Sequence, residues 1–383
     1  RPFDAAAGAS VISYGRLGQT LVSMPAFRSS QLFRAPVVVA PLRRDALDRS
    51  NLALANAGTA ADGPVTLRVT LSPAGSDGAT GEPVRRDVTI PAGGFAQLDD
   101  VLALLPGAES AIARVERIAG EAPYAAWGVL HDRESGDASL VPAVDAVNGF
   151  AAGRLTVPVA MESSAFESEL LLANASNAER RLRLTFAWES LEAPVGRVHL
   201  DLTLAGGAVV SMPRFVEELR SRGVAGLPPR GALVAGPVVV EPLGVGGLEG
   251  VVAGARTART GSRRVGVYGP GVPDHGEATA AARAAGLGPG YANVAVVNLS
   301  DVEATFRVEA RFNGTLTGSS ELRLPPLGWG QVSGLRGSTR VERQGGPGAF
   351  VAYAVAMLRT LNGGPGVGDG DGAWVPTEPE PGP

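Results

Sequence analysis

Residues 50–58 read SNLALANAG, and this pattern returns twice further along the chain. It appears as SELLLANAS at residues 168–176 and as ANVAVVNLS at residues 292–300. The asparagines that the three copies share are Asn56, Asn174 and Asn298. Their spacings of 118 and 124 residues are too long for a solenoid repeat and suit a whole small domain. The sequence therefore predicts three copies of one domain.

The stretch after each copy alternates apolar and polar residues, which is typical of an antiparallel sheet with one buried and one solvated face. The apolar positions are Val65, Leu67, Val69 and Leu71, then Leu182, Leu184 and Phe186, then Phe306, Val308, Ala310 and Phe312. A turn with glycine for a positive φ follows, at residues 90–94, 204–207 and 324–328. About seven short strands per copy indicate a sandwich or a barrel, and the alternating faces favour the sandwich because they need a second sheet over them.

Smaller signals refine this interpretation. Short helical turns are expected at residues 99–105 and 213–220, the second with Pro213 at the first helical position. Residues 277–285 have a helix-forming composition that ends at Gly286. Asn313-Gly314 predicts a hairpin.

The last strands are clear in the first and third copies only. Residues 124–129 match residues 350–355, where Tyr124, Trp127, Phe350 and Tyr353 are interpreted as core residues. The second copy diverges after Met212, and we place its counterparts at residues 237–240 and 264–268.

These patterns divide the chain into four parts. We expect a partial repeat over residues 1–30 and β-sandwiches over residues 31–147, 148–275 and 276–383, the last with a Gly/Pro-rich tail. The partial repeat contains two expected strands that resemble the end of a repeat, and the first half of that repeat is missing. We expect these strands to pair with an exposed sheet edge in the same chain or in a neighbour. Its candidate assembly residues are Val11, Ile12, Tyr14, Leu21, Val22 and Met24.

Composition excludes several function classes. The net charge is −4 and all 34 basic residues are arginines scattered among acids, so we expect no nucleic-acid partner. The absence of cysteine excludes disulfides, thiolate metal sites and cysteine nucleophiles. The longest unbroken apolar run that we find, residues 350–358, is too short to span a membrane. Because the chain starts with Arg1, we expect a processed or fragmentary product whose export signal is gone.

No catalytic motif accompanies the repeats, so we expect no enzyme and no cofactor. The three histidines, His131, His199 and His275, do not recur at equivalent positions, which favours surface or strand-end roles. Asp369 and Asp371 alternate with glycine and are candidate Ca²⁺ ligands, although the later bidentate acid is missing. Residues 132–137 form a weaker acidic loop. Asn174, Asn298 and Asn313 match the glycosylation pattern, but a turn asparagine would explain all three copies of the repeat.

Residues 49–58 (RSNLALANAG), 91–98 (PAGGFAQL) and 140–143 (LVPA) resemble immunoglobulin-like repeat modules. Such modules are found in tandem in large secreted proteins of high-GC bacteria. The resemblance covers most of residues 27–377 and consists of strand ends and turns. It implies an all-β fold of three tandem Ig-like antiparallel β-sandwiches with short helical turns. It also implies export and a stalk, surface or fibre role at the bacterial cell surface or outside the cell.

The function expected from these observations is that of an extracellular structural protein. It would be a homo-oligomeric subunit of a filament, sheath or surface layer, assembled through edge-strand or tail contacts. The alternative is a secreted adhesin, or a stalk module that binds carbohydrate or protein without catalysis. A third reading, a hydrolase with an unrecognised site, lacks a pair of residues to carry it.

Overall fold

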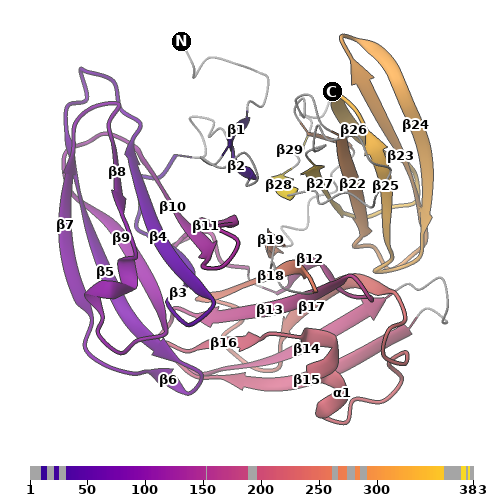
Figure 1. The fold of residues 1–383 in the computed structure, drawn as a ribbon, viewed down its shortest axis with the longest axis horizontal. Coiled ribbons are helices and arrows are strands. Elements are labelled where there is room, and N and C mark those ends of the chain that lie inside the picture. Colours follow the sequence, from indigo (N-terminus) through magenta and orange to yellow (C-terminus); the bar gives the residue numbers. More distant parts are fainter. Residues whose placement is uncertain are drawn as a thin grey trace.

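The structure is a computed structural model that describes most of the chain. The described residues are 10–14, 21–25, 32–151, 153–188, 196–260, 266–273, 281–284, 291–357, 372–376 and 378–379. Within them the chain is almost entirely antiparallel β-sheet (Figure 1), which confirms the all-β class expected from the sequence. Three stretches are named here for later use: segment 1 is residues 32–151, segment 2 is residues 153–273, and segment 3 is residues 281–379.

Segment 1 is a nine-stranded sheet of order β6–β5–β9–β3–β11–β10–β4–β8, with β7 beside β5. Its strands are β3 (Val37–Arg43), β4 (Asp48–Asn56), β5 (Val65–Gly75), β6 (Gly78–Ala79), β7 (Val84–Ile90), β8 (Phe95–Leu98), β9 (Ser110–Ala119), β10 (Tyr124–Asp132) and β11 (Ala138–Asp145). β11 joins two halves, since its first part pairs with β10 and its last part with β3. A 3-10 helix, Val101–Leu104, lies in the stretch where a helical turn was expected.

Segment 2 repeats these pairings. Its elements are β12 (Leu155–Glu162), β13 (Phe166–Asn174), β14 (Arg180–Trp188), β15 (Gly196–Leu204), β16 (Val209–Met212), α1 (Phe215–Ser221), β17 (Val234–Pro242), β18 (Val251–Arg259), β19 (Gly266–Pro270) and β20 (Val272–Pro273). The order is β15–β14–β17–β12–β13–β18–β19, with β16 beside β13 and β20 beside β12. The helix begins after Arg214, so Pro213 lies outside it and is not the first helical residue as expected.

Segment 3 forms two sheets of orders β24–β23–β26–β21–β29 and β25–β22–β27–β28. Its strands are β21 (Ala281–Ala284), β22 (Tyr291–Asn298), β23 (Ala304–Phe312), β24 (Thr315–Leu324), β25 (Trp329–Leu335), β26 (Ser338–Gly345), β27 (Phe350–Met357), β28 (Gly372–Pro376) and β29 (Glu378–Pro379). The helix expected over residues 277–285 is wrong for its described part, because β21 pairs with β26 and β29. Sheet pairing outweighs the weak helix propensity of four residues.

The neighbours of equivalent strands agree in all three segments. The asparagine-bearing strands β4, β13 and β22 lie between β8 and β10, β16 and β18, and β25 and β27 respectively. The register agrees as well, since Trp127 faces Pro142, Gly254 faces Pro270 and Tyr353 faces Pro376. β18 is therefore the counterpart of β10 and β27. The sequence pattern did not reveal this strand. The residues expected as its counterparts, 237–240 and 264–268, fall largely in β17 and β19 instead.

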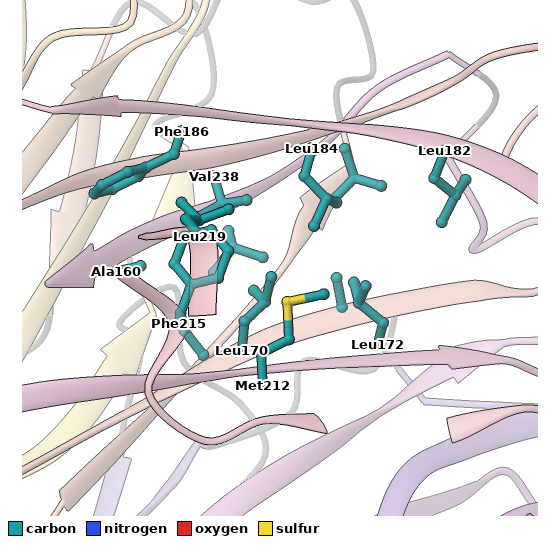
Figure 2. Close-up of a cluster of buried hydrophobic side chains, with 14 of the residues drawn as sticks. Ala160, Leu170, Leu172, Leu182, Leu184, Phe186, Met212, Phe215, Leu219 and Val238 are labelled. Carbon is teal, nitrogen blue, oxygen red and sulfur yellow. The ribbon is translucent and has the colours of Figure 1, made fainter. Parts of the chain in front are cut away.

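Each segment has a main core, and the core of segment 1 extends to Leu171 and Tyr268 of segment 2. In segment 1, Leu52 and Leu54 of β4 pack with Leu67 and Val69 of β5. In segment 2, α1 also contributes (Figure 2), where Phe215 lies edge-on to Phe186 with ring centroids 5.5 Å apart. A third cluster, which includes Val294, Phe306 and Phe350, fills segment 3.

The alternating strands bury the expected faces with one exception. All the predicted apolar positions of β5, β14 and β23 are fully buried apart from Phe312. Phe312 is 54% exposed, because it ends β23 at the Asn313-Gly314 hairpin, beyond the cover of the core. Positive φ values at both turn residues confirm the hairpin.

The three repeat asparagines hold the same turn. The side-chain amide of Asn298 donates to the carbonyls of Val302, Leu324 and Pro325, and its Oδ1 accepts from Ser300 N–H. Asn174 and Asn56 make the equivalent bonds. Because the amide nitrogen that would carry a sugar is buried and donating, this turn role accounts for all three copies.

The two N-terminal strands, β1 (Ser10–Tyr14) and β2 (Leu21–Pro25), form an antiparallel hairpin. The candidate assembly residues Val11, Tyr14, Leu21 and Met24 pair across it, as Val11 with Met24 and Tyr14 with Leu21; Val22 pairs with Ser13 and Ile12 with Ser23. β2 also lies against β11 and β28. Within the described residues no helix is both long and apolar enough to cross a membrane.

Candidate functional site: the joint between segments 1 and 2

The joint between segments 1 and 2 begins with an apolar layer. Val38, Ala40 and Ile112 of segment 1 pack with Ala173 and Val252 of segment 2 in one buried cluster. These side chains point away from the cores of their own segments, since they belong to neither of the two core clusters. The outer face of one sheet therefore serves as the cover for the outer face of the next.

A charged group lies beside this layer, and it is completely buried. Arg256 of β18 donates from Nη1 to Oδ1 of Asp48 at 2.7 Å, and both side chains are 0% exposed. The Arg256 Nη2 lies 3.8 Å from Oδ2 of Asp137, which is also 0% exposed. The peptide nitrogen of Gly266 donates to the same Asp137 carboxylate at 2.7 Å. Segment 2 thus contributes the donors and segment 1 the carboxylates.

In a second contact across the joint, the arginine comes from segment 1 and the carboxylate from segment 2. Arg43 of β3 in segment 1 forms an ion pair with Glu169 of β13 in segment 2, and it also bonds Asp45 at 2.5 Å. The hydroxyl of Ser211 donates to the same Glu169 oxygen at 2.5 Å. Two oppositely directed arginine–carboxylate contacts therefore cross the joint.

Burial and charge act against each other on these groups. Burial alone lowers the pKa of Arg43, but the attraction of Glu169, Asp45 and Asp48 outweighs it, so the pKa is raised. For Asp45, burial raises the pKa. The charge of Arg43 and the N–H groups of Asp48 and Leu47 lower it by more, so the pKa is lowered overall. Both groups are thus held in their charged forms.

The backbone also approaches closely at this joint. A Cβ on Gly207, in the turn before β16, would lie 3.1 Å from Cβ of Ala79 in β6. The hydroxyl of Ser139 lies 3.4 Å from the carbonyl of Gly266. A side chain at Gly207 would therefore require Ala79 to shift by a few tenths of an ångström.

The joint between segments 2 and 3 has a similar apolar layer. Val272 of β20 packs with Val297 and Val351 on the outer face of segment 3. Arg197 donates to the carbonyl of Pro326, which lies in the turn equivalent to that of Gly207, at 3.4 Å. The two joints therefore use equivalent surfaces of the repeated segments.

Most of the predicted site residues lie apart from this joint. His131 contacts Asn51, with 3.4 Å between His131 Nε2 and Asn51 Nδ2. Burial, followed by repulsion from Arg49, lowers its pKa to about 4. His199 contacts the hydroxyl of Thr185. His275, Asp369 and Asp371 lie outside the described residues.

The acidic loop 132–137 is structural in this fold. Oδ1 of Asp132 accepts the N–H groups of Glu134 and Ser135, as in an Asx turn. Asp137 faces Arg256 instead of a shared ligand position. Across the described ranges, no three histidine or acidic side chains are grouped so that they could hold a metal ion.

Sequence reasoning missed Asp48, Glu169 and Arg256. A usable signal was present, because Glu169 interrupts the apolar run of β13 and Arg256 that of β18. A charge inside a run of buried residues requires a partner of opposite sign, but the sequence does not name it.

The arrangement can hold two segments in one orientation. At the joint an apolar layer is combined with buried arginine–carboxylate pairs that link the two segments. No family model matches this chain, and neither does any curated protein or solved structure.

Proposed function

We propose that this chain is a rigid extracellular structural protein built from three tandem Ig-like β-sandwich domains. The domains would be residues 31–147, 148–275 and 276–383, after a partial unit over residues 1–30. The repeated strand neighbours and a main core in each segment support this division.

The observation that carries the proposal is the buried Arg256–Asp48 pair across the first joint. Domains in one chain move relative to one another unless their interface is large and apolar. Here an apolar layer is combined with buried charges that lose their partners if the segments separate. Such a joint transmits force and keeps a fixed angle, as a structural subunit requires.

The remaining features are proposed on the same basis. The chain would act at the bacterial surface or outside the cell, as a homo-oligomeric subunit of a filament, sheath or surface layer. A protein without cysteine avoids oxidative mispairing during export. Neither catalysis nor a resident cofactor is part of the proposal, and Ca²⁺ at Asp369 and Asp371 would appear as a rise in Tm on adding the ion.

Negative-stain microscopy and small-angle scattering over a range of protein concentrations test this function. We expect filaments or sheets above a threshold concentration, and below it one rigid particle whose scattering fits a single shape. Monomers at every concentration, or scattering that requires freely jointed domains, would contradict it.

One observation favours the alternative function, an adhesin that binds carbohydrate. Phe95 is 57% exposed and its ring lies 6.0 Å from that of Trp127, so an aromatic surface is accessible on β8. Sugar rings pack on such surfaces. Binding of the wild-type chain to a glycan array, lost in Phe95→Ser without loss of fold, would support the adhesin. Equal binding by both chains would argue against this site.

A further inference from the structure

Four strands of this chain meet although they belong to different parts of the sequence. β2 lies against β11 and β28, β11 lies against β19, and β19 lies against β28. Figure 1 shows the labels of all four in the middle of the ribbon, between the three segments. The four strands therefore form a closed ring of contacts in the order β2, β11, β19 and β28, with one strand from each segment and one from the N-terminal part.

Three of these strands are equivalent by position. β11, β19 and β28 each contain the proline that faces Trp127, Gly254 or Tyr353 on the preceding strand. β2 also ends on a proline, Pro25, and pairs antiparallel with the strand before it. The pair of strands β1 and β2 (residues 10–14 and 21–25), called the N-terminal hairpin, thus occupies the place of a fourth segment's last strands.

The neighbouring sheet faces are suited to such an occupant. Trp127, Val129 and Ala138 form a cluster on segment 1 that is separate from its core, and Trp127 is only 6% exposed. On segment 3, Tyr353 of β27 also lies outside the core cluster and is only 2% exposed. Both aromatic side chains are therefore covered although neither belongs to the core of its own segment.

The hairpin has the matching chemistry. The sequences of its strands, SVISY and LVSMP, contain no charged residue. A two-stranded hairpin is marginally stable alone, so its order depends on the surface that receives it. It is joined to segment 1 only through residues 26–31.

We propose that the surface between β11 and β28 is a docking site for the N-terminal hairpin, and that it accepts the hairpin of a second copy of this chain. The contacts made within one chain and between two chains are the same, so exchange costs little. Each chain carries one hairpin and one site, which makes the contact head-to-tail. A contact of this kind that does not close produces a fibre. The inference rests on the proposed function, for which it names the assembly site.

Cysteine pairs test the exchange, because the full chain contains no cysteine of its own. One variant carries Ser23→Cys in β2 and a second carries Leu140→Cys in β11. The two are mixed, and a short thiol-reactive cross-linker is added. We expect cross-linked dimers, identified by mass spectrometry, whose yield rises with concentration. A matched control replaces Leu140→Cys by Thr317→Cys on the distant edge strand β24, where only background cross-linking is expected.

A locked chain provides the second measurement. The double variant Ser23→Cys/Leu140→Cys is closed at high dilution with a cleavable cross-linker, so that the hairpin stays in its own chain. Light scattering should then show monomers, and cleavage should restore assembly. Cross-linking no higher than in the Thr317→Cys control would overturn the exchange.

The two proposals fail in different ways. If locked chains still form filaments, the docking site is wrong while the structural function stands. If cross-linked dimers form but the wild-type chain shows no filaments or sheets in negative stain, the docking site stands and the filament is wrong.

Discussion

The guanidinium of Arg256 and the carboxylate of Asp48 form a 2.7 Å hydrogen bond between residues that are 208 positions apart in the chain. Both side chains are fully buried. Removing a charge from water is costly, so this pair is favourable only while both partners are present. Its main effect is to penalise any other arrangement of segments 1 and 2.

Arg256→Met should therefore be severely destabilising, because Asp48 would be left charged and buried. We expect a loss of about 3–5 kcal/mol in the free energy of unfolding, measured by urea titration. The double variant Arg256→Met/Asp48→Leu should recover part of this loss, since it removes both charges of the pair. The recovery should be incomplete, because Asp137 loses Arg256 and Arg43 loses Asp48.

The control is Arg183→Met, which removes an arginine paired with Asp201 on the exposed surface of segment 2. Exposed ion pairs contribute little, so its urea midpoint should stay close to that of the wild type. If Arg256→Met behaved like Arg183→Met, the buried pair would not hold the joint.

The repeat could be recognised from the sequence because the asparagine turn is encoded within a short stretch of residues. Asn56, Asn174 and Asn298 bond to backbone groups of nearby turns, and the alternation in β5, β14 and β23 follows from a single buried face. Both signals lie within short windows, where periodicity is informative.

The joint could not be predicted in the same way. Leu171 and Ala173 alternate with core residues in β13, but they cluster with side chains of segment 1, which is distant in the sequence. The near-continuous apolar run in each asparagine-bearing strand does indicate burial on both faces. The apolar run does not indicate which surface covers the second face of the strand, and it does not identify the arginine that pairs with Glu169.

The turn asparagine offers a second test. Asn298→Ala removes the amide whose two hydrogens are shared among the carbonyls of Val302, Leu324 and Pro325, and it leaves these carbonyls without this donor. A cost of at least about 2 kcal/mol is expected in urea unfolding. Ser300→Gly is the matched control, because the first copy has Gly58 at this position, and it should cost clearly less. Equal losses would show that the amide is not the element that holds the turn.

His131 should make stability depend on pH in a defined window. Its pKa is about 4 in the folded chain and near 6.5 when unfolded, so between these values the unfolded chain binds the proton more readily. Stability attributable to His131 is therefore present above pH 6.5 and is lost as the pH falls towards 4. His131→Gln should flatten the urea midpoint between pH 6.5 and 4. Asp45, whose pKa is lowered, acts only below this window.

The last prediction uses one turn position that occurs three times. Gly93, Gly207 and Leu327 all have positive φ, at 66°, 73° and 58°, in equivalent turns. Alanine at either glycine pays the same conformational cost of about 1 kcal/mol. Around Gly93 an added Cβ meets nothing within 4 Å, whereas at Gly207 it meets Ala79 across the joint.

Gly207→Ala should therefore lower Tm more than Gly93→Ala does, and the difference measures how tightly the joint is packed. Leu327→Gly should raise Tm, because glycine adopts this positive-φ conformation without strain. Scanning calorimetry of the three variants compares them directly. Equal Tm values for the two alanine variants would mean that segments 1 and 2 separate at this turn without resistance.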